Sequence, residues 1–250
     1  MDNGGNCRKP NHPARVMIRM GERSVSRGTL SRMTSPTSQV PPTSRTEPSA
    51  FVARLPIGER LPLPEIAHWD IFPFEGDLQI KVLDPPLLPE PPRAGEPGGS
   101  ECFACSEPER GVLWRDEHWH VRYLPQPTGL PAVLMLFPNQ HLDLDDLPDD
   151  LAAGFGLMIR RLSKAVQAVD GVARVHVNRW GDGGAHLHVW FLARPAGMWQ
   201  LRGTCLAIWD DLLPPVPVEE WLDNLRRIGA ALAADGGTAN EPVQPEPNPG

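Results

Sequence analysis

The 250-residue chain has 40% apolar residues, enough for one or two globular domains, and its formal net charge is −7. An acidic chain offers few contacts to phosphate backbones, so broad nucleic-acid binding is not expected. There is neither a stretch near the roughly 20 apolar residues that span a bilayer nor an apolar secretory signal, so we expect a cytoplasmic protein with no membrane partner. In that compartment its four cysteines are expected to be metal ligands, catalytic groups or packed thiols rather than disulfides.

Residues 1–50 differ from the rest of the chain in charge and composition. They hold eight Arg and Lys against three Asp and Glu, which leaves −12 for the remainder. Few of them are apolar, so they cannot bury enough surface to offset the entropy of an ordered chain. We predict a disordered, basic tail, which is either simply solvated or contacts an anionic partner.

Residues 51–100 are predicted to form an N-terminal extension. Short alternating apolar runs surround Glu75-Gly76-Asp77 within residues 68–83, a pattern typical of a hairpin or an added edge strand. Residues 85–100 are rich in proline and glycine and predict a linker.

Residues 101–235 carry the patterns of a folded α+β domain. Strands are predicted at 118–124, 130–138, 172–180 and 185–193, with helices beginning near Asp149 and covering 218–234. The first helix has an apolar stripe expected to face the core: Leu151, Phe155, Met158, Ile159, Leu162 and Val166. Strands, helix, strands and helix in this order predict a mostly antiparallel sheet with flanking helices. Residues 236–250 are predicted to be a disordered tail.

The stretch GDGGAHLHVWF, residues 181–191, places two histidines on one side of a predicted strand. Because side chains alternate, His186, His188 and Trp190 share a face, while the apolar residues between them share the other and should be buried. Residues two apart on a strand lie about 6.6 Å apart. The two histidines are therefore too far apart to bond each other comfortably and suit two neighbouring centres. Two other histidines, His118 and His120, are expected to be surface or edge residues.

Cys102 and Cys105 form a CxxC pair just before the predicted core. Two thiolates at this spacing suit one zinc ion, which favours tetrahedral nitrogen and sulfur ligands. A single CxxC is a weak signal, so two unligated cysteines remain an alternative; a redox dithiol is disfavoured because no thioredoxin-like βαβ unit surrounds the pair. If zinc binds, the best further ligands are His141, which follows a buried strand, and His186.

Several of these features occur together in one known order. FPNQHLDLDDLP before a helix, a strand ending in asparagine, a glycine loop and the HxH strand resemble the histidine-triad (HIT) superfamily over about residues 102–195. The resemblance implies a HIT-like domain over 101–235. The cysteine and histidine pattern is most similar to the galactose-1-phosphate uridylyltransferase branch, and that likeness implies a structural zinc held by Cys102, Cys105, His141 and His186.

The resemblance also implies a chemistry. The middle histidine of the family motif matches His188, which would attack the α-phosphorus of a nucleotide and form a covalent nucleotidyl-histidine that water or a second phosphorylated substrate releases. Asn178 and the backbone amides of the glycine loop, including Gly183 and Gly184, would contact the phosphate. The implied partner is a nucleotide-type small molecule. HIT proteins are often dimers, so a homodimer is possible unless the N-terminal segment covers that face.

Trp190 departs from the family motif, which has histidine or glutamine at this third position. Indole can only donate one hydrogen bond, and losing general-acid help typically costs about 10²–10⁴-fold in rate. Two functions therefore stay open. One is a nucleotidyl hydrolase or transferase acting on a phosphoester or phosphoramidate. The other is a catalytically inert domain that binds a nucleotide or a protein, in which zinc is only structural and Trp190 stacks on a base.

Overall fold

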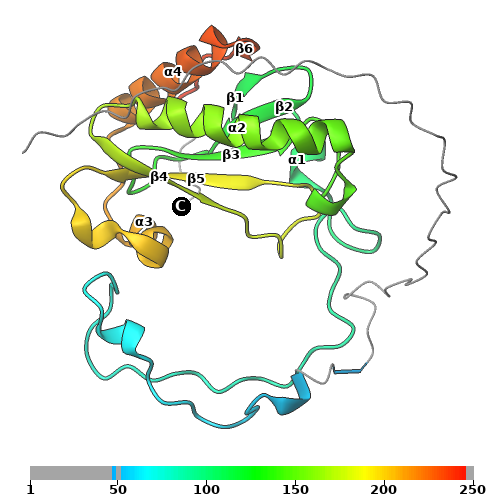
Figure 1. Ribbon diagram of the computed structural model, residues 1–250, viewed down its shortest axis with the longest axis vertical. Coiled ribbons are helices and arrows are strands. Elements are labelled where there is room, and N and C mark those ends of the chain that lie inside the picture. Colours follow the sequence, from blue (N-terminus) through cyan, green and yellow to red (C-terminus); the bar gives the residue numbers. More distant parts are fainter. Residues whose placement is uncertain (1–46, 49–51, 246–250) are drawn as a thin grey trace, which may run out of the picture. The chain divides into compact units, whose positions relative to one another are not determined.

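The computed structural model describes residues 47–48 and 52–245 (Figure 1). The disorder predicted for residues 1–50 and 236–250 falls outside this range at residues 1–46, 49–50 and 246–250. Within the described residues, no helix is both long and apolar enough to cross a bilayer.

A six-stranded sheet forms the centre of the structure, and all its named strand pairs are antiparallel. Across the sheet the strands are β4 (Val172–Asn178), β5 (Val189–Pro195), β3 (Val133–Pro138), β2 (Trp119–Tyr123), β1 (Val112–Arg115) and β6 (Thr238–Ala239). With its flanking helices, this sheet confirms the predicted α+β class.

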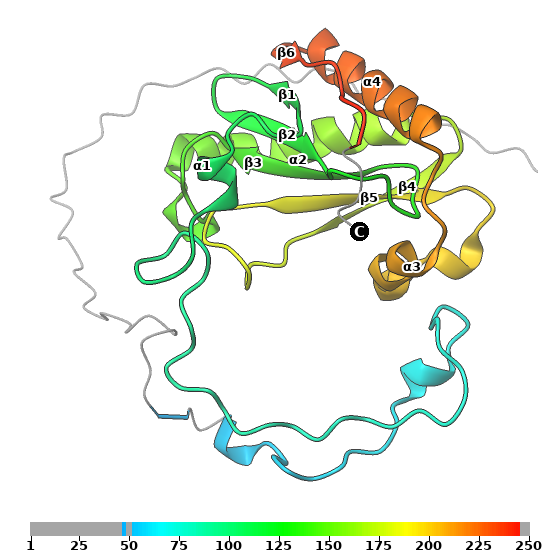
Figure 2. The same cartoon turned by 180° about the vertical axis from the view of Figure 1, so that it is seen from behind.

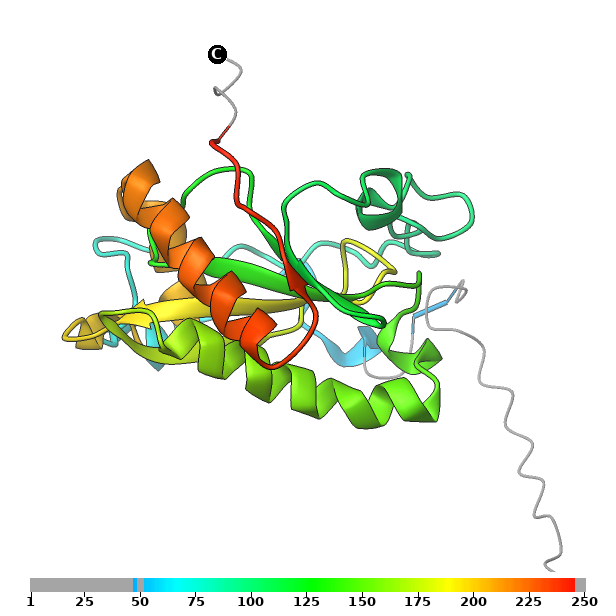
Figure 3. The ribbon, with the colours of Figure 1, turned by 90° about the horizontal axis from the view of Figure 1, so that it is seen from above.

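Two long helices, α2 (Asp149–Gln167) and α4 (Val218–Ala234), pack on each other and on the sheet (Figures 1 and 3). Both carry two acidic residues in the first turn, which suit the positive end of the helix dipole. The apolar stripe of α2 lies in the core as predicted, with Leu162 and Val166 fully buried. The view from behind shows the strands in front of α2 (Figure 2).

The short helices lie in the connections. They are η2 (Val52–Arg54), η3 (Glu65–His68), α1 (Phe103–Ser106), η4 (Leu144–Asp146), η5 (Trp199–Leu201), η6 (Gly203–Cys205) and α3 (Leu206–Leu212). A second, smaller apolar cluster involves Leu192 of β5 and Leu206 of α3. Cys205 is buried, as expected of a small core residue.

Alternate residues of the HxH segment lie on opposite faces of the sheet. Leu187, Val189 and Phe191 are buried in the main core with α2 and α4, which confirms the predicted alternation. His188 and Trp190 are partly exposed and line a cavity. The face opposite the main core therefore carries the candidate site.

The hairpin predicted within residues 68–83 is wrong. Among the described residues this segment has no strand pair, only a single bridge between Ile57 and Leu83. Of its residues only Ile71 is buried, whereas Trp69, Phe74, Val82 and Leu83 are exposed. Ile71 is 6% exposed, and its carbonyl accepts a hydrogen bond from Trp209 Nε1 at 2.8 Å, beside α3. Proline at position 73 and at positions 85 and 86 removes donors that a hairpin ladder needs.

The tail predicted after residue 236 is ordered through residue 245. Gly236 and Gly237 adopt positive φ angles of 110° and 76°, so the chain turns directly after α4 and β6 pairs with β1. Asn240 then donates through its side chain to the carbonyl of Val112 at 3.0 Å. The edge of β1 offers backbone groups that would otherwise be unpaired. Hydrogen bonding to this edge orders the tail, although its composition is polar.

Candidate metal centre and nucleophile

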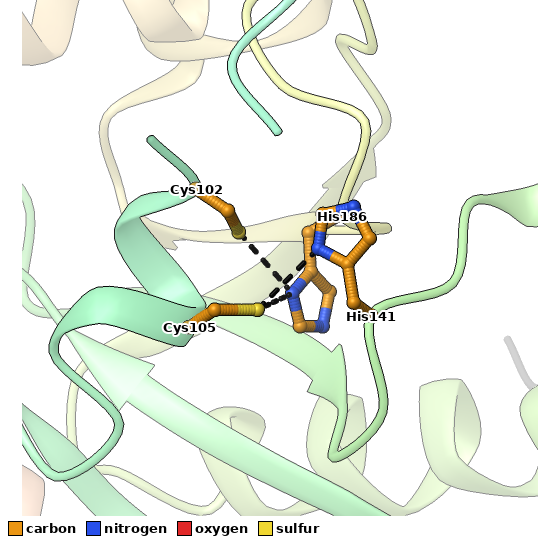
Figure 4. A group of neighbouring side chains, drawn as sticks. All are labelled: Cys102, Cys105, His141 and His186. Carbon is orange, nitrogen blue, oxygen red and sulfur yellow. Dashed lines mark hydrogen bonds between the residues drawn. The ribbon is translucent and has the colours of Figure 1, made fainter. Parts of the chain in front are cut away.

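The structure brings together four side chains that are distant in the sequence. Cys102 and Cys105 come from the start of α1, His141 follows β3, and His186 precedes β5 (Figure 4). Their four donor atoms all lie within 4.8 Å of one another. These are the four residues that the resemblance implied as zinc ligands.

The distances between donors fit one tetrahedral zinc. Cys102 Sγ lies 3.5 Å from His186 Nδ1, and Cys105 Sγ lies 3.4 Å from His141 Nδ1 and 3.6 Å from His186 Nδ1. Bonds of about 2.3 Å to sulfur and 2.0–2.1 Å to nitrogen put a sulfur and a nitrogen about 3.5 Å apart around a tetrahedral ion. The donor set and its spacing therefore match a Cys₂His₂ zinc site.

A backbone carbonyl fixes the tautomer of the most buried ligand. His186 is 4% exposed, and its Nε2 lies 2.9 Å from the carbonyl oxygen of Pro138. Because a carbonyl only accepts, Nε2 carries the proton and Nδ1 presents its lone pair to the two sulfurs. Burial also lowers the pKa of His186, which keeps the imidazole in the neutral form that binds metal.

The end of the predicted linker, at residues 94–95, packs directly against the proposed metal ligands. An ideal Cβ on Gly95 would lie 2.6 Å from His141 Cε1 and 3.2 Å from Cys102 Cβ, so only glycine lets the backbone pass this close to the ligands. Ala94 accepts a hydrogen bond from the amide of Ala185 at 2.9 Å. The sequence pattern gave no signal for these contacts.

An ion-pair network holds the same segment against the glycine loop. Asp143 pairs with Arg93 at 2.7 Å and with Arg179 at 2.6 Å, and Arg93 also donates to the carbonyl of Gly181 at 3.0 Å. Hydrogen bonds from Leu144 and the two arginines lower the pKa of Asp143 against the opposing effect of burial. The carboxylate therefore stays ionised and joins three segments of chain.

His188 is oriented by the backbone of the neighbouring metal-ligand residue. Its Nδ1 lies 2.9 Å from the carbonyl oxygen of His186. Nδ1 is therefore the protonated nitrogen, and Nε2 keeps a free lone pair. The ring stacks on Phe137, with centroids 6.0 Å apart, and it lines a cavity of about 200 Å³.

Only some of the other residues predicted to contact the phosphate line this cavity. Gly183, Gly184 and Trp190 line it, but Asn178 is not among the lining residues. The amides of the two glycines donate no backbone hydrogen bond within the described part of the chain. Asn178 is half-buried and faces Trp190 across the β4–β5 pair. Trp190 in turn lies against Trp180, with ring centroids 6.0 Å apart.

The strand that carries His188 begins later than predicted. A strand from residue 185 was expected, but β5 starts at Val189. The amide of Ala185 bonds to Ala94, and the amide of Leu187 bonds to the carbonyl of Leu142 at 2.8 Å. Both histidines of the HxH segment therefore lie in an extended stretch that pairs with loops, directly before the strand.

His120 was expected near the surface, and this is wrong. It is 3% exposed, stacks on Phe137 with centroids 5.2 Å apart and meets Asn139 Oδ1 through Nδ1 at 3.0 Å. Burial lowers its pKa to about 3, so the ring is neutral. Its Nε2 is buried and has no hydrogen-bond partner among the residues that the structure describes. His120 thus supports Phe137, the ring that also touches His186 and His188.

No family model matches the chain, and no curated protein matches it in sequence. Solved structures similar to this chain include histidine-triad proteins. One from Bradyrhizobium japonicum is 16% identical and covers 53% of this chain and 97% of its own length, with a TM-score of 0.42. A zinc-bound one from Mycobacterium smegmatis is 18% identical and covers 53% and 90%, with a TM-score of 0.39.

A mutant uridylyltransferase is also similar. It is 21% identical over 54% of this chain and has a TM-score of 0.38. This chain spans 48% of that enzyme's length. At identities under 25% and TM-scores under 0.5, these likenesses assign no chemistry to the chain.

Proposed function

We propose that this chain is a HIT-like nucleotidyl hydrolase or transferase in which His188 is the nucleophile. The observation that carries the proposal is the hydrogen bond from His188 Nδ1 to the carbonyl of His186, at 2.9 Å. In the neutral ring this contact puts the proton on Nδ1 and the lone pair on Nε2, and the ring lines a cavity. A neutral imidazole with a free nitrogen is a competent nucleophile near pH 7.

The proposed reaction has two steps. Nε2 of His188 bonds to the α-phosphorus of a nucleotide phosphoester or phosphoramidate, and the bond from phosphorus to the leaving group breaks with its electron pair going to that group. The substituted imidazole then carries a positive charge, which the carbonyl of His186 stabilises through Nδ1–H. Water or a second phosphorylated substrate next attacks phosphorus, gives up its proton to solvent and releases the free histidine.

Donors for the phosphoryl oxygens are available beside the nucleophile. Gly184 lies next to His188, since an ideal Cβ on it would be 4.0 Å from His188 Cε1. The uncommitted amides of Gly183 and Gly184 are therefore our candidates for binding the charge that builds up on phosphorus. Asn178, next to Trp190, is the candidate for contacting a more distant oxygen.

The proposed zinc acts through structure. Cys102, Cys105, His141 and His186 would fill all four positions of a tetrahedral ion, so it would have no open position for substrate. The metal would fold the CxxC segment against the sheet and fix His186. Because the carbonyl of His186 holds His188, fixing the ligand also fixes the nucleophile.

Trp190 limits which substrates react well. It lines the cavity with His188, but its indole cannot protonate a departing group. Substrates whose leaving group is a phosphate ester, stable as an anion, should therefore react better than those that release an amine. If catalysis is lost, the same residues support the second candidate, a binding domain in which Trp190 and Trp180, with centroids 6.0 Å apart, stack on a base.

Trapping the intermediate distinguishes the two candidates. The zinc-loaded protein is incubated with a nucleotide sugar or a nucleoside phosphoramidate, and intact mass spectrometry looks for one added nucleotidyl group. We expect an adduct on the wild type and on His118→Asn, an exposed control, and none on His188→Asn. Nucleotide binding by the wild type without any adduct would instead favour the inert binding domain.

The proposal carries two further expectations. The chain acts in the cytoplasm on a nucleotide-type small molecule, and it forms a homodimer. Sedimentation of the zinc-loaded protein at several concentrations tests the second expectation, and a monomer throughout would contradict it.

A further inference from the structure

Arg122, on β2, is a buried charged side chain that contacts residues 102–109, which we call the CxxC segment. It is 1% exposed, and its Nη2 donates hydrogen bonds to the carbonyls of Ala104 at 2.9 Å and Pro108 at 3.3 Å. A guanidinium stays charged in proteins, so its burial costs free energy that its neighbours must offset. The groups that offset this cost identify the part of the chain to which Arg122 is tied.

The groups that stabilise the cation come mainly from the CxxC segment. No carboxylate forms an ion pair with Arg122 among the described residues. Burial lowers the pKa of Arg122, and the charge of Arg115 acts in the same direction. The groups that oppose this shift are the sulfurs of Cys102 and Cys105 and the carboxylate of Glu109. All three belong to the CxxC segment, so they compensate the cation only while that segment lies against β2.

Two aromatic rings also lie against the guanidinium. Its Cζ is 5.3 Å from the ring centroid of Phe103, in the CxxC segment, and 5.4 Å from that of Phe137, on β3. A cation over a ring face is attracted to it. Both rings line the cavity at His188, and Phe137 stacks on His188. Arg122 therefore contacts both the segment that carries the cysteines and the ring that supports the proposed nucleophile.

The CxxC segment has a small buried surface of its own. Ala104 is its only buried residue, and α1 is a helix of four residues. The amides of Cys105 and Ser106 both donate to the carbonyl of Cys102, at 3.1 and 2.9 Å. Because a single helical turn is not stable by itself in water, contacts from outside must keep this turn in place until a metal joins the two sulfurs.

We propose that Arg122 is the positioning residue of the metal centre: it anchors the CxxC segment to β2 and so holds Cys102 and Cys105 where zinc binding needs them. Burial of the cation and binding of zinc favour the same arrangement of the segment, so each strengthens the other. The inference goes beyond the proposed function because it concerns the metal ligands and requires no reaction at His188.

The first test compares the zinc affinities of two variants on β2 by competition with a chromophoric chelator. Arg122→Met keeps most of the volume and removes the charge and the two hydrogen bonds, so zinc affinity should fall about 10–100-fold, as for other groups that support a metal ligand. Val121→Ala is the matched control. Val121 is fully buried in the main core on the other face of the sheet, so its loss lowers stability and should leave zinc affinity unchanged. A wild-type affinity in Arg122→Met, or an equal loss in both variants, overturns the proposal.

The second test follows hydrogen exchange in the metal-free chain by mass spectrometry and includes the wild type, so it does not depend on a variant that folds. We expect residues 102–109 to be protected in the metal-free wild type. In Arg122→Met they should exchange faster, while β3 and β5 keep their protection. An unprotected segment in the metal-free wild type would show that Arg122 does not anchor it. Faster exchange across the whole sheet in Arg122→Met would show a general loss of stability, and either result contradicts the proposal.

Discussion

Replacing Gly95 by alanine should weaken zinc binding, although Gly95 is not itself one of the four proposed ligands. The new Cβ would lie 2.6 Å from His141 Cε1 and 3.2 Å from His141 Nε2. Carbon atoms in contact prefer about 3.5–4.0 Å, so the imidazole must move by roughly 1 Å. Metal–ligand distances tolerate only about 0.2 Å. We expect a loss of zinc affinity of about 10–100-fold, the usual cost of disturbing the groups that support a metal ligand.

Gly98→Ala is the matched control in the same loop. Gly98 has a φ of +84°, close to the +89° of Gly95, but its nearest neighbour is Pro92 Cγ at 3.9 Å. Both variants therefore impose the strain of a positive φ on alanine, about 1–3 kcal/mol, and only one presses on His141. Zinc affinity is measured by competition with a chromophoric chelator. Equal affinities in the two variants would refute the reasoning.

Three other outcomes follow from the site. Zinc content should fall sharply in Cys102→Ala and stay at the wild-type level in Cys205→Ala, by metal analysis of the purified chains, since Cys205 lies in the apolar core. Trp190→His should raise the rate on a substrate with an amine leaving group by about 10²–10⁴-fold by restoring a proton donor, and no gain in a continuous hydrolysis assay would count against the proposed role of this position. With the pKa of His120 at about 3 in the folded chain and about 6.5 when exposed, the unfolded chain takes up the proton first. The contribution of His120 to the free energy of unfolding should therefore drop by about 2 kcal/mol between pH 7 and pH 5 and continue to fall toward pH 3. In urea titrations the slope should be steeper in the wild type than in His120→Phe, because the lowered pKa of His186 acts in both.

The spacing of apolar residues along the chain predicted which faces of the helices and strands pack on the core. The apolar stripe of α2 and the alternation of Leu187, Val189 and Phe191 both reflect which face packs on the core. The metal cluster could be predicted from the sequence for another reason. Cys102, Cys105 and two histidines at strand ends form a pattern whose order matches a known superfamily, and the structure brings these four donors within 4.8 Å of one another.

The features that could not be predicted from the sequence depend on tertiary contacts. Gly95 resembles any linker glycine until His141 is folded against it. The pairing of β6 with β1 depends on an edge that only the assembled sheet presents. His120 alternates like an edge residue, yet β2 lies inside the sheet and buries it against Phe137. Such contacts join residues far apart in the chain and leave no local pattern.

The most direct test of the account is the coordination of the bound metal, read by X-ray absorption at the zinc edge of the loaded protein. We predict four ligands, two sulfurs at about 2.3 Å and two nitrogens at about 2.0–2.1 Å, with one sulfur lost in Cys105→Ala. A shell of oxygen and nitrogen alone, unchanged in that variant, would show that Cys102, Cys105, His141 and His186 do not bind zinc together, and the support for His188 would be lost with them.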